Sequence, residues 1–503
     1  MANRRIGVWL LVVSGLLAAT IAVWLYPRAF PLSGLNLRVS RGEAQRLAAQ
    51  FLQEMGIQPP RGYRTVTTFE ADSTVTAYLE RTLGLREANR VAQREGFAYA
   101  WSTRWFRPDQ VTEYYVDVDP DGRIVFFAQY LPDQEALPES HQPRQVAERF
   151  LQERAGIDLR QYQLVSEERQ PLASRVEYHF TWERQGFRLG EATQRVAVSV
   201  SGDRVLRFAR WLRIPQSFED STDREQKKGE QLADVSFRFG TLLYLLQLVI
   251  VVVALVRREI DWRIAWAPAL LVLGVSLIGA LNSIPLWIAQ METGQTWAAF
   301  WVQVLLGVPT NAMTTTLQLL SVLVAAEYLY RKWCPESIPL RHWLTRGGIA
   351  SGAGRARVAL GYWVLAMDLL YTVLFYAVGR QVFGVWMHSN VPYNDMMSTY
   401  LPWVYSLLDA IEPAFTEELA DRLLLIVALT ALLRRRWLAI VLSALLWSLA
   451  HCGYPSHPYY IRAVELFPVG VFWGWLVMRY GPLPTLVAHF GYNALVGSDI
   501  FLY

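Results

Sequence analysis

The sequence Glu417-Glu418-Leu-Ala-Asp-Arg422 lies inside an apolar segment, residues 401–433, that is long enough to cross a membrane. Two later apolar segments carry the sequences Trp447-Ser-Leu-Ala-His451 and His489-Phe-Gly-Tyr-Asn493. Ionisable side chains are costly in lipid, and by default they mark functional sites there. The three motifs therefore predict a reaction centre inside the bilayer.

The composition indicates a membrane protein that also has a polar domain. Of the 503 residues, 53% are apolar and 18% are charged. This is too apolar for an ordinary soluble enzyme and too charged for a chain that lies wholly in the membrane. The small net charge of +4 gives no indication of nucleic-acid binding. The two cysteines, Cys334 and Cys452, lie outside the large polar segment, which excludes a disulfide framework there.

Nine apolar segments predict a polytopic α-helical membrane protein. They are residues 6–25, 239–256, 264–288, 297–329, 358–379, 401–433, 438–451, 461–478 and 483–503. By the positive-inside rule, the basic residues at their ends place the N-terminus in the cytoplasm and residues 33–237 outside the cell membrane. Two segments are unusually long, so we expect 297–329 to be tilted or broken near Pro309 and 401–433 to be interrupted at Pro413.

The polar segment 33–237 contains two similar units. Residues 44–54 and 143–153 share an amphipathic helical pattern that ends near a glycine. Each unit later has two alternating strands joined by a turn, at residues 114–127 and 195–208. These patterns predict an inserted extracytoplasmic α+β domain of two tandem repeats, which faintly resembles PepSY-type repeats. A spacer or docking role is favoured over a second active site.

The predicted organisation has four parts. They are a membrane anchor (1–32), the exterior domain (33–237), membrane helices with a cytoplasmic basic loop (238–400) and a catalytic membrane core (401–503). A charged linker, residues 220–229, is expected to join the exterior domain to the membrane helices.

The motifs combine acid–base groups with hydrogen-bond donors. Glu418 and Arg422 are four residues apart on one helical face, where they can form an ion pair. Glu417 has no arginine at that spacing and is the candidate general base for activating water. His489 and Asn493 share one face of the last segment and can present two donors to an oxyanion. A charge network or interhelical clamp that only stabilises packing is the alternative interpretation.

The motifs Glu-Glu-x-x-x-Arg, aromatic-x-x-x-His and His-x-x-x-Asn, in this order on separate segments, resemble those of the CPBP (ABI) family of intramembrane glutamic endopeptidases. That family includes the CAAX prenyl endopeptidases, and the resemblance covers residues 401–503. It implies peptide-bond hydrolysis in which a glutamate and a histidine activate water, two residues support them and the last motif holds the oxyanion. Carried over by motif, Glu417 and His451 would activate water, and Glu418 and Arg422 would support them. His489 and Asn493 would hold the oxyanion.

The chain departs from the family pattern at two motifs. Trp447 stands where the second motif usually has Phe, which is a tolerable aromatic exchange. Asp421 adds a carboxylate beside Arg422 and is a second candidate partner for it. In the predicted topology, Glu417 and His451 lie toward the outer side, whereas His489 lies nearer the inner end of its segment. Helix tilt, or a later start of the last helix, has to bring them together.

No cofactor is predicted. Zinc bound by Glu417, His451 and His489 is the alternative, and it ranks second because the sequence has no His-Glu-x-x-His motif. The expected partners are the lipid bilayer, a membrane-protein or lipidated-peptide substrate, and an extracytoplasmic protein. A non-enzymatic membrane receptor, immunity factor or scaffold is the rival function, and a transporter ranks third because no inverted repeat is evident.

Overall fold

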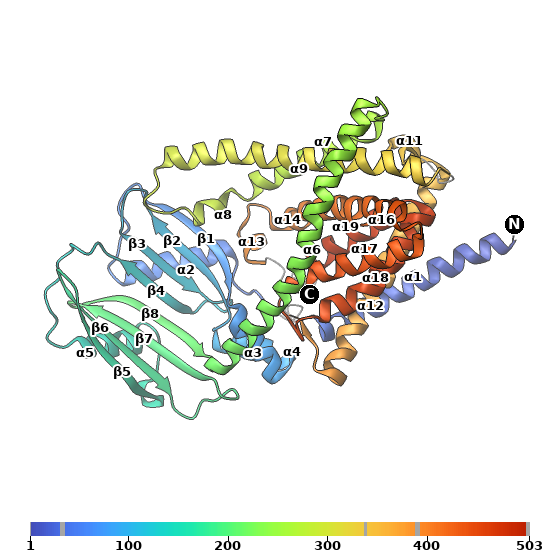
Figure 1. The fold of residues 1–503 in the computed structure, drawn as a ribbon. Coiled ribbons are helices and arrows are strands. Elements are labelled where there is room, and N and C mark those ends of the chain that lie inside the picture. The colour runs from blue at the N-terminus through green and yellow to red at the C-terminus, as the bar shows by residue number, and fades with distance from the viewer. Residues whose placement is uncertain (1, 31–35, 336–339, 388–392, 499–503) are drawn as a thin grey trace.

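The computed structural model describes residues 2–30, 36–335, 340–387 and 393–498. An eight-stranded antiparallel sheet domain lies beside a bundle of helices (Figure 1). The predicted boundary between the anchor and the exterior domain, at residues 32 and 33, lies outside the described residues.

Within the described ranges, seven helical segments are long and apolar enough to cross a membrane. They belong to α1 (Ala2–Ala29), α6 (Gln216–Val256), α7 (Trp266–Asn282), α9 (Trp297–Trp333), α12 (Gly352–Phe383), α17 (Arg436–Ala450) and α18 (Ile461–Tyr480). The chain is therefore a polytopic membrane protein with a sheet domain. The total of nine spans stays a prediction.

The predicted span 401–433 is divided into shorter helices. They are α14 (Pro402–Asp409), α15 (Ile411–Glu417), a π-helical segment η4 (Glu418–Leu424) and α16 (Leu425–Leu433). The expected interruption is present, but it lies at Ala410, three residues before the predicted Pro413, which stands in the first turn of α15. A proline is tolerated there, since the first turn of a helix has no partner for its N–H groups. The last described helix is α19 (Leu483–Val496).

Two expectations about the membrane segments need correction. The helix α9 runs continuously through Pro309, so the predicted break there is wrong and tilt is the alternative that remains. Residues 264–288 form two helices, α7 and α8 (Ile284–Ala289), because the chain turns at Ser283 before Pro285.

Residues 220–229 are part of α6, so the prediction of a charged linker is wrong. Their Glu, Gln, Lys and Arg side chains favour helix. Side-chain hydrogen bonds of 3.0 Å join Gln216 to Asp220 and Gln226 to Glu230, each four residues apart. As a result, one helix continues from the last strand of the sheet domain into the membrane bundle (Figure 1).

The sheet domain contains the helices and hairpins that the two units predict. Its strands follow the order β1 (Arg64–Ala71), β2 (Tyr99–Phe106), β3 (Glu113–Val118), β4 (Ile124–Tyr130), β8 (Arg204–Arg213), β7 (Thr193–Ser201), β6 (Val176–Arg184), β5 (Tyr162–Pro171). Its helices are α2 (Arg41–Glu54), α3 (Ser73–Leu83), α4 (Leu85–Glu95) and α5 (Pro143–Glu153). Both predicted hairpins, β3–β4 and β7–β8, are confirmed.

Smaller elements complete the described chain. They are η2 (Leu159–Gln161), η3 (Trp262–Ile264), α10 (Arg341–Leu344), α11 (Arg346–Ala350), β9 (Trp386–Met387), α13 (Tyr393–Ser398), η5 (His451–Gly453) and β10 (Ser456–His457).

One face of the sheet is covered by helices and the other face is open. Alternate residues of each strand point to opposite faces. On the covered face, Phe51 of α2 packs on Phe127 of β4 at 5.5 Å between ring centroids. Phe150 of α5 packs on Phe208 of β8 at 5.4 Å, and Phe127 pairs with Phe208 across the strands. The two predicted units thus make corresponding contacts within a single core.

Arg104 ties the sheet domain to the membrane helices. The side chain is buried on β2, and Nε donates a 2.6 Å hydrogen bond to Glu113 Oε2. Nη1 donates to the carbonyl oxygens of Ala289 and Met291 at 2.8 Å each, at and just beyond the end of α8. Carbonyls at a helix end lack intrahelical partners, so the guanidinium satisfies groups on both sides of this contact.

Arg104→Ala is expected to destabilise the whole protein, because it leaves Glu113 and two carbonyls without this partner. Loss of one member of a buried ion pair costs about 3–5 kcal/mol. Thermal unfolding in detergent should therefore begin well below the wild-type temperature. Arg107→Ala, at an exposed position just after β2, is the control. Equal melting temperatures for the two variants would contradict the assignment.

Candidate active site

The acidic motif lies where an α-helix becomes a π-helix. Glu417 is the last residue of α15, and Glu418 and Arg422 belong to the buried part of η4. The π-helix has i→i+5 hydrogen bonds and occurs frequently at functional sites. This change of helix geometry sets the relative directions of the two glutamates.

Glu418, Arg422 and His489 form a buried charge network. Arg422 Nη1 donates to Glu418 Oε1 at 2.6 Å, and His489 Nδ1 lies 2.8 Å from the same oxygen. The Glu418 side chain is fully buried, and those of Arg422 and His489 are 2% and 8% exposed. The predicted pair of Glu418 and Arg422 is present, so Asp421 does not displace it.

Two indole rings enclose this network. The guanidinium carbon of Arg422 lies 3.9 Å from the ring centroid of Trp447 and 4.9 Å from that of Trp473. Trp473 also contacts the ring of His489 edge-on at 5.5 Å, and its Nε1 donates to Asp368 Oδ2 at 2.9 Å. The aromatic faces offset part of the cost of burying the arginine.

Glu417 and His451 are linked through Trp447. The indole Nε1 donates a 2.7 Å hydrogen bond to Glu417 Oε2. His451 Nδ1 lies 2.9 Å from the Trp447 carbonyl oxygen, which can only accept, so Nδ1 carries a proton. In the neutral imidazole, Nε2 is then the nitrogen that can accept a proton.

His489 closes the arrangement. Its Nε2 lies 3.9 Å from Glu417 Oε2, so the first and third motifs meet despite the difference in depth that the predicted topology suggests. The distance exceeds a hydrogen bond, and both groups can face a common reacting group. Asn493 lies one turn further along α19 and is half-buried. Its amide has no hydrogen bond to the other motif residues in the described part of the chain.

Sequence reasoning missed the roles of Trp447, Trp473 and Asp368. The indole of Trp447 holds Glu417 through an N–H that the usual Phe lacks, so this exchange changes the site. In the sequence, the signal for this role is the position of Trp447, four residues before His451. Trp473 and Asp368 carried no such signal, because nothing in their local sequence links them to the motifs.

Within the described residues, no group of three or more His, Cys, Asp or Glu side chains is placed to hold a metal ion.

Comparison with known proteins agrees with the class that the motifs indicate. Residues 399–495 match the family described as type II CAAX prenyl endopeptidase Rce1-like, the same segment whose motifs resemble the CPBP (CAAX protease) family. The match supports a CAAX-protease-type intramembrane peptidase.

One relative is similar over nearly the whole chain. The sporulation-killing factor biosynthesis protein SkfC of Bacillus subtilis (strain 168) is 22% identical over 497 residues. These cover 95% of this chain and 93% of the relative. No solved structure matches the chain.

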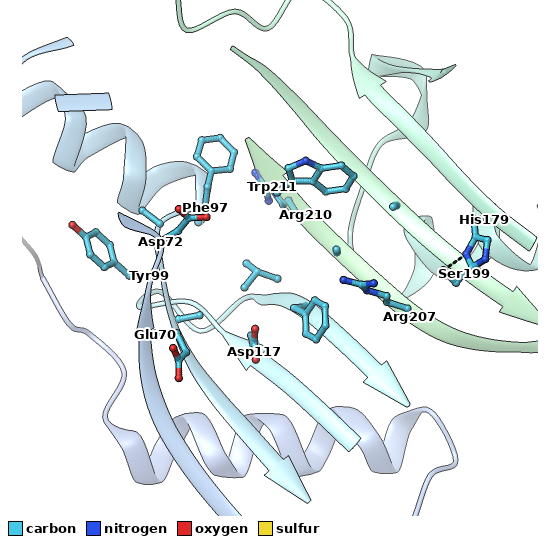
Figure 2. A pocket seen from close by; sticks show the side chains of 17 residues that line it. Glu70, Asp72, Phe97, Tyr99, Asp117, His179, Ser199, Arg207, Arg210 and Trp211 are labelled. Atoms are coloured by element: carbon cyan, nitrogen blue, oxygen red, sulfur yellow. Dashed lines mark hydrogen bonds between the residues drawn. The ribbon is translucent and has the colours of Figure 1, made fainter. Parts of the chain in front are cut away.

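A cavity of about 540 Å³ lies on the open face of the sheet, away from the three motifs (Figure 2). Glu70 and Asp117 line it from β1 and β3, and Arg207 and Arg210 line it from β8 (Figure 2). Asp117 Oδ1 and Arg210 Nε are buried there without a hydrogen-bond partner. Carboxyl groups thus line the cavity from one half of the sheet and guanidinium groups from the other, where Arg210 Nη2 also pairs with Glu95 Oε2 at 3.2 Å.

Burial, against a hydrogen bond from Ser102 that lowers the pKa and with a smaller rise from the nearby Glu70 carboxylate, raises the pKa of Asp117 to about 7. The folded state therefore binds this proton more tightly than the unfolded chain does. The associated stability is present at low pH and is lost as the pH rises from about 4 toward 7.

Glu418→Gln is expected to impair folding far more than Asp421→Asn. The first change removes the negative partner of a buried arginine, which costs about 3–5 kcal/mol. The second leaves that pair intact. The yield of monodisperse protein and its melting temperature in detergent measure the difference. Equal losses for the two variants would mean that Arg422 does not depend on Glu418.

Asp117→Asn is expected to stabilise the protein at pH 8, because it removes a charge that burial disfavours. The melting temperature should rise by about 2–4 °C there, the response to roughly 1 kcal/mol, and by nothing near pH 4. Asp133→Asn, at an exposed position of the same domain, is the control. An equal gain at both pH values would show that packing, not ionisation, is responsible.

Proposed function

We propose that this chain is an intramembrane endopeptidase that hydrolyses a peptide bond with water activated by Glu417 and His451. The observation that carries the proposal is the meeting of three motifs from separate helices around Glu417 Oε2. That oxygen accepts from Trp447 and lies 3.9 Å from His489 Nε2. The CPBP match of the same segment supports hydrolysis rather than packing alone.

Each group has a distinct chemical role in this proposal. Glu417 takes a proton from the attacking water, and His451, with Nδ1–H held by the Trp447 carbonyl, accepts that proton on Nε2 and passes it to the nitrogen of the leaving amine. The new C–O bond forms first and gives a tetrahedral intermediate, and the peptide C–N bond then breaks as its nitrogen receives the proton, so the products are an acid and an amine.

The last motif would stabilise the tetrahedral intermediate. Nδ1–H of His489 is donated to Glu418, so in the imidazolium form of this ring Nε2–H is the donor available for an oxyanion, with the Asn493 amide as a second donor. Glu418 and Arg422 support this histidine and do not touch the substrate. The proposal needs no cofactor, and zinc at Glu417, His451 and His489 is the alternative that a chelator tests.

The substrate is proposed to be a membrane protein or a lipidated peptide that enters from the bilayer. The exterior domain, residues 33–237, is proposed to lie outside the cell membrane and to receive an extracytoplasmic protein. Opposite charges on the two walls of its cavity suit a peptide segment that carries both a cation and a carboxylate. The name of the relative describes factor biosynthesis, which favours processing of a precursor as the biological setting.

Cleavage by the reconstituted protein tests the proposal. Wild type, Glu417→Gln and His451→Ala are incorporated into liposomes with prenylated and unmodified peptides, and products are identified by mass spectrometry. Both variants should lose about 100-fold or more in rate, as for loss of acid–base catalysis. EDTA and phenanthroline should leave wild-type cleavage unchanged.

The same experiment separates the rival functions. Cleavage by both variants at the wild-type rate would mean that the residues serve packing, as in a receptor, immunity factor or scaffold. Loss of wild-type cleavage on chelation, with recovery on adding zinc, would favour the metal alternative.

A further inference from the structure

The helix α6 packs directly against the turn that carries His451. This turn, η5 (His451–Gly453), follows α17 and belongs to none of the elements that surround the charge network. Apart from the adjacent pair Glu225 and Gln226, the contacting residues of α6 follow one another at intervals of three or four positions, so they form one face of the helix. We name the five residues of this face the α6 stripe: Glu225, Gln226, Gly229, Ala233 and Ser236.

Gly229 makes the closest approach. A Cβ atom at this position would lie closer than 3.0 Å to the carbonyl oxygen of Cys452, a separation that real Cβ atoms essentially never have. The same Cβ would lie 3.3 Å from the Cys452 carbonyl carbon. The obstacle is backbone, not the end of a flexible side chain, so only glycine fits without movement of the turn or the helix.

Polar contacts fix the turn on both sides of Gly229. Gln226 Nε2 donates to the Gly453 carbonyl oxygen at 2.8 Å. Ser236 Oγ donates to the Leu446 carbonyl oxygen at 2.7 Å, on α17 just before Trp447. Glu225 Oε2 accepts from the Tyr459 backbone N–H at 3.1 Å, beyond the turn.

These contacts lie on both sides of His451 in the sequence. Leu446, Cys452, Gly453 and Tyr459 are all held through backbone groups, so the path of the chain around His451 is defined by α6. The imidazole is held by groups of its own segment, through the hydrogen bond of Nδ1 to the Trp447 carbonyl and ring contacts with Trp447 and Tyr454. Its position relative to Glu417 therefore depends on where α6 places the turn.

We propose that the α6 stripe positions His451 for catalysis, with Gly229 and Gln226 as positioning residues. The inference rests on the proposed function. It also gives the exterior domain a direct route to the active site, because the same helix begins immediately after β8 of the sheet. A protein bound to that domain could change cleavage by moving α6, without touching the catalytic side chains.

Gly229→Ala tests the proposal, with Gly240→Ala as a matched control on the same helix. A Cβ at Gly240 would meet no atom within 4 Å. The first substitution should lower kcat about 100-fold by displacing His451 by roughly 1 Å, with KM unchanged, since substrate binding does not require the imidazole. Gly240→Ala should retain the wild-type kcat.

A second measurement is independent of cleavage. Cys452 is 1% exposed, and displacement of its turn should increase its rate of modification by N-ethylmaleimide. Peptide mass spectrometry of the intact protein reports this rate, with the buried Cys334 as internal reference. The rate should rise in Gly229→Ala and stay at the wild-type value in Gly240→Ala.

Gln226→Glu provides a second variant in case Gly229→Ala does not fold. It keeps the side-chain size and replaces the donor facing the Gly453 carbonyl by an acceptor, so it should also lower kcat and raise Cys452 labelling. Gln231→Glu, at an exposed position of α6, is its control.

The outcomes are distinguishable. If the test variants match their controls in both kcat and labelling, the positioning role is wrong. If labelling rises as expected but the wild type cleaves no peptide, the proposed function and the catalytic role of the stripe both fail, whereas the packing contact stands.

Discussion

The site depends on one shared carboxylate oxygen. Glu418 Oε1 accepts from Arg422 on its own helix and from His489 on α19, within a fully buried environment. The buried guanidinium is not tolerable there without the anion, and the anion is not tolerable without its donors. The interaction therefore joins two helices and sets the imidazole of His489 at the same time. The position of Glu417 next to that imidazole follows from it.

Aromatic side chains take the place of solvent around these charges. Trp447 and Trp473 cover the guanidinium of Arg422, and the indole N–H groups are each used by a carboxylate, Glu417 or Asp368. A phenylalanine at position 447 would provide the apolar face and not the donor. Paired charges and indole rings thus stabilise this polar centre among the apolar helices.

Contacts within one helix could be predicted from the sequence, whereas most contacts between helices could not. The pair of Glu418 and Arg422 follows from a spacing of four residues, whereas the bond of Glu418 to His489 joins residues 71 positions apart. The two hairpins of the sheet domain were readable from their turns, but the strand order that joins β4 to β8 was not. Residues 220–229 misled the prediction, because their charges suit both a solvated linker and a helix. The close contact of Gly229 with another segment has no signature in local sequence.

The π-helical geometry of η4 has a consequence for how such motifs are compared between proteins. Hydrogen bonds in this segment reach one residue further than in an α-helix, so a given spacing in the sequence corresponds to a different rotation about the helix axis. Two chains with identical Glu-Glu-x-x-x-Arg letters can therefore direct the second glutamate toward different neighbours, according to whether the turn is wide or regular. The directions of the motif side chains thus depend on the pitch of the helix as well as on the sequence.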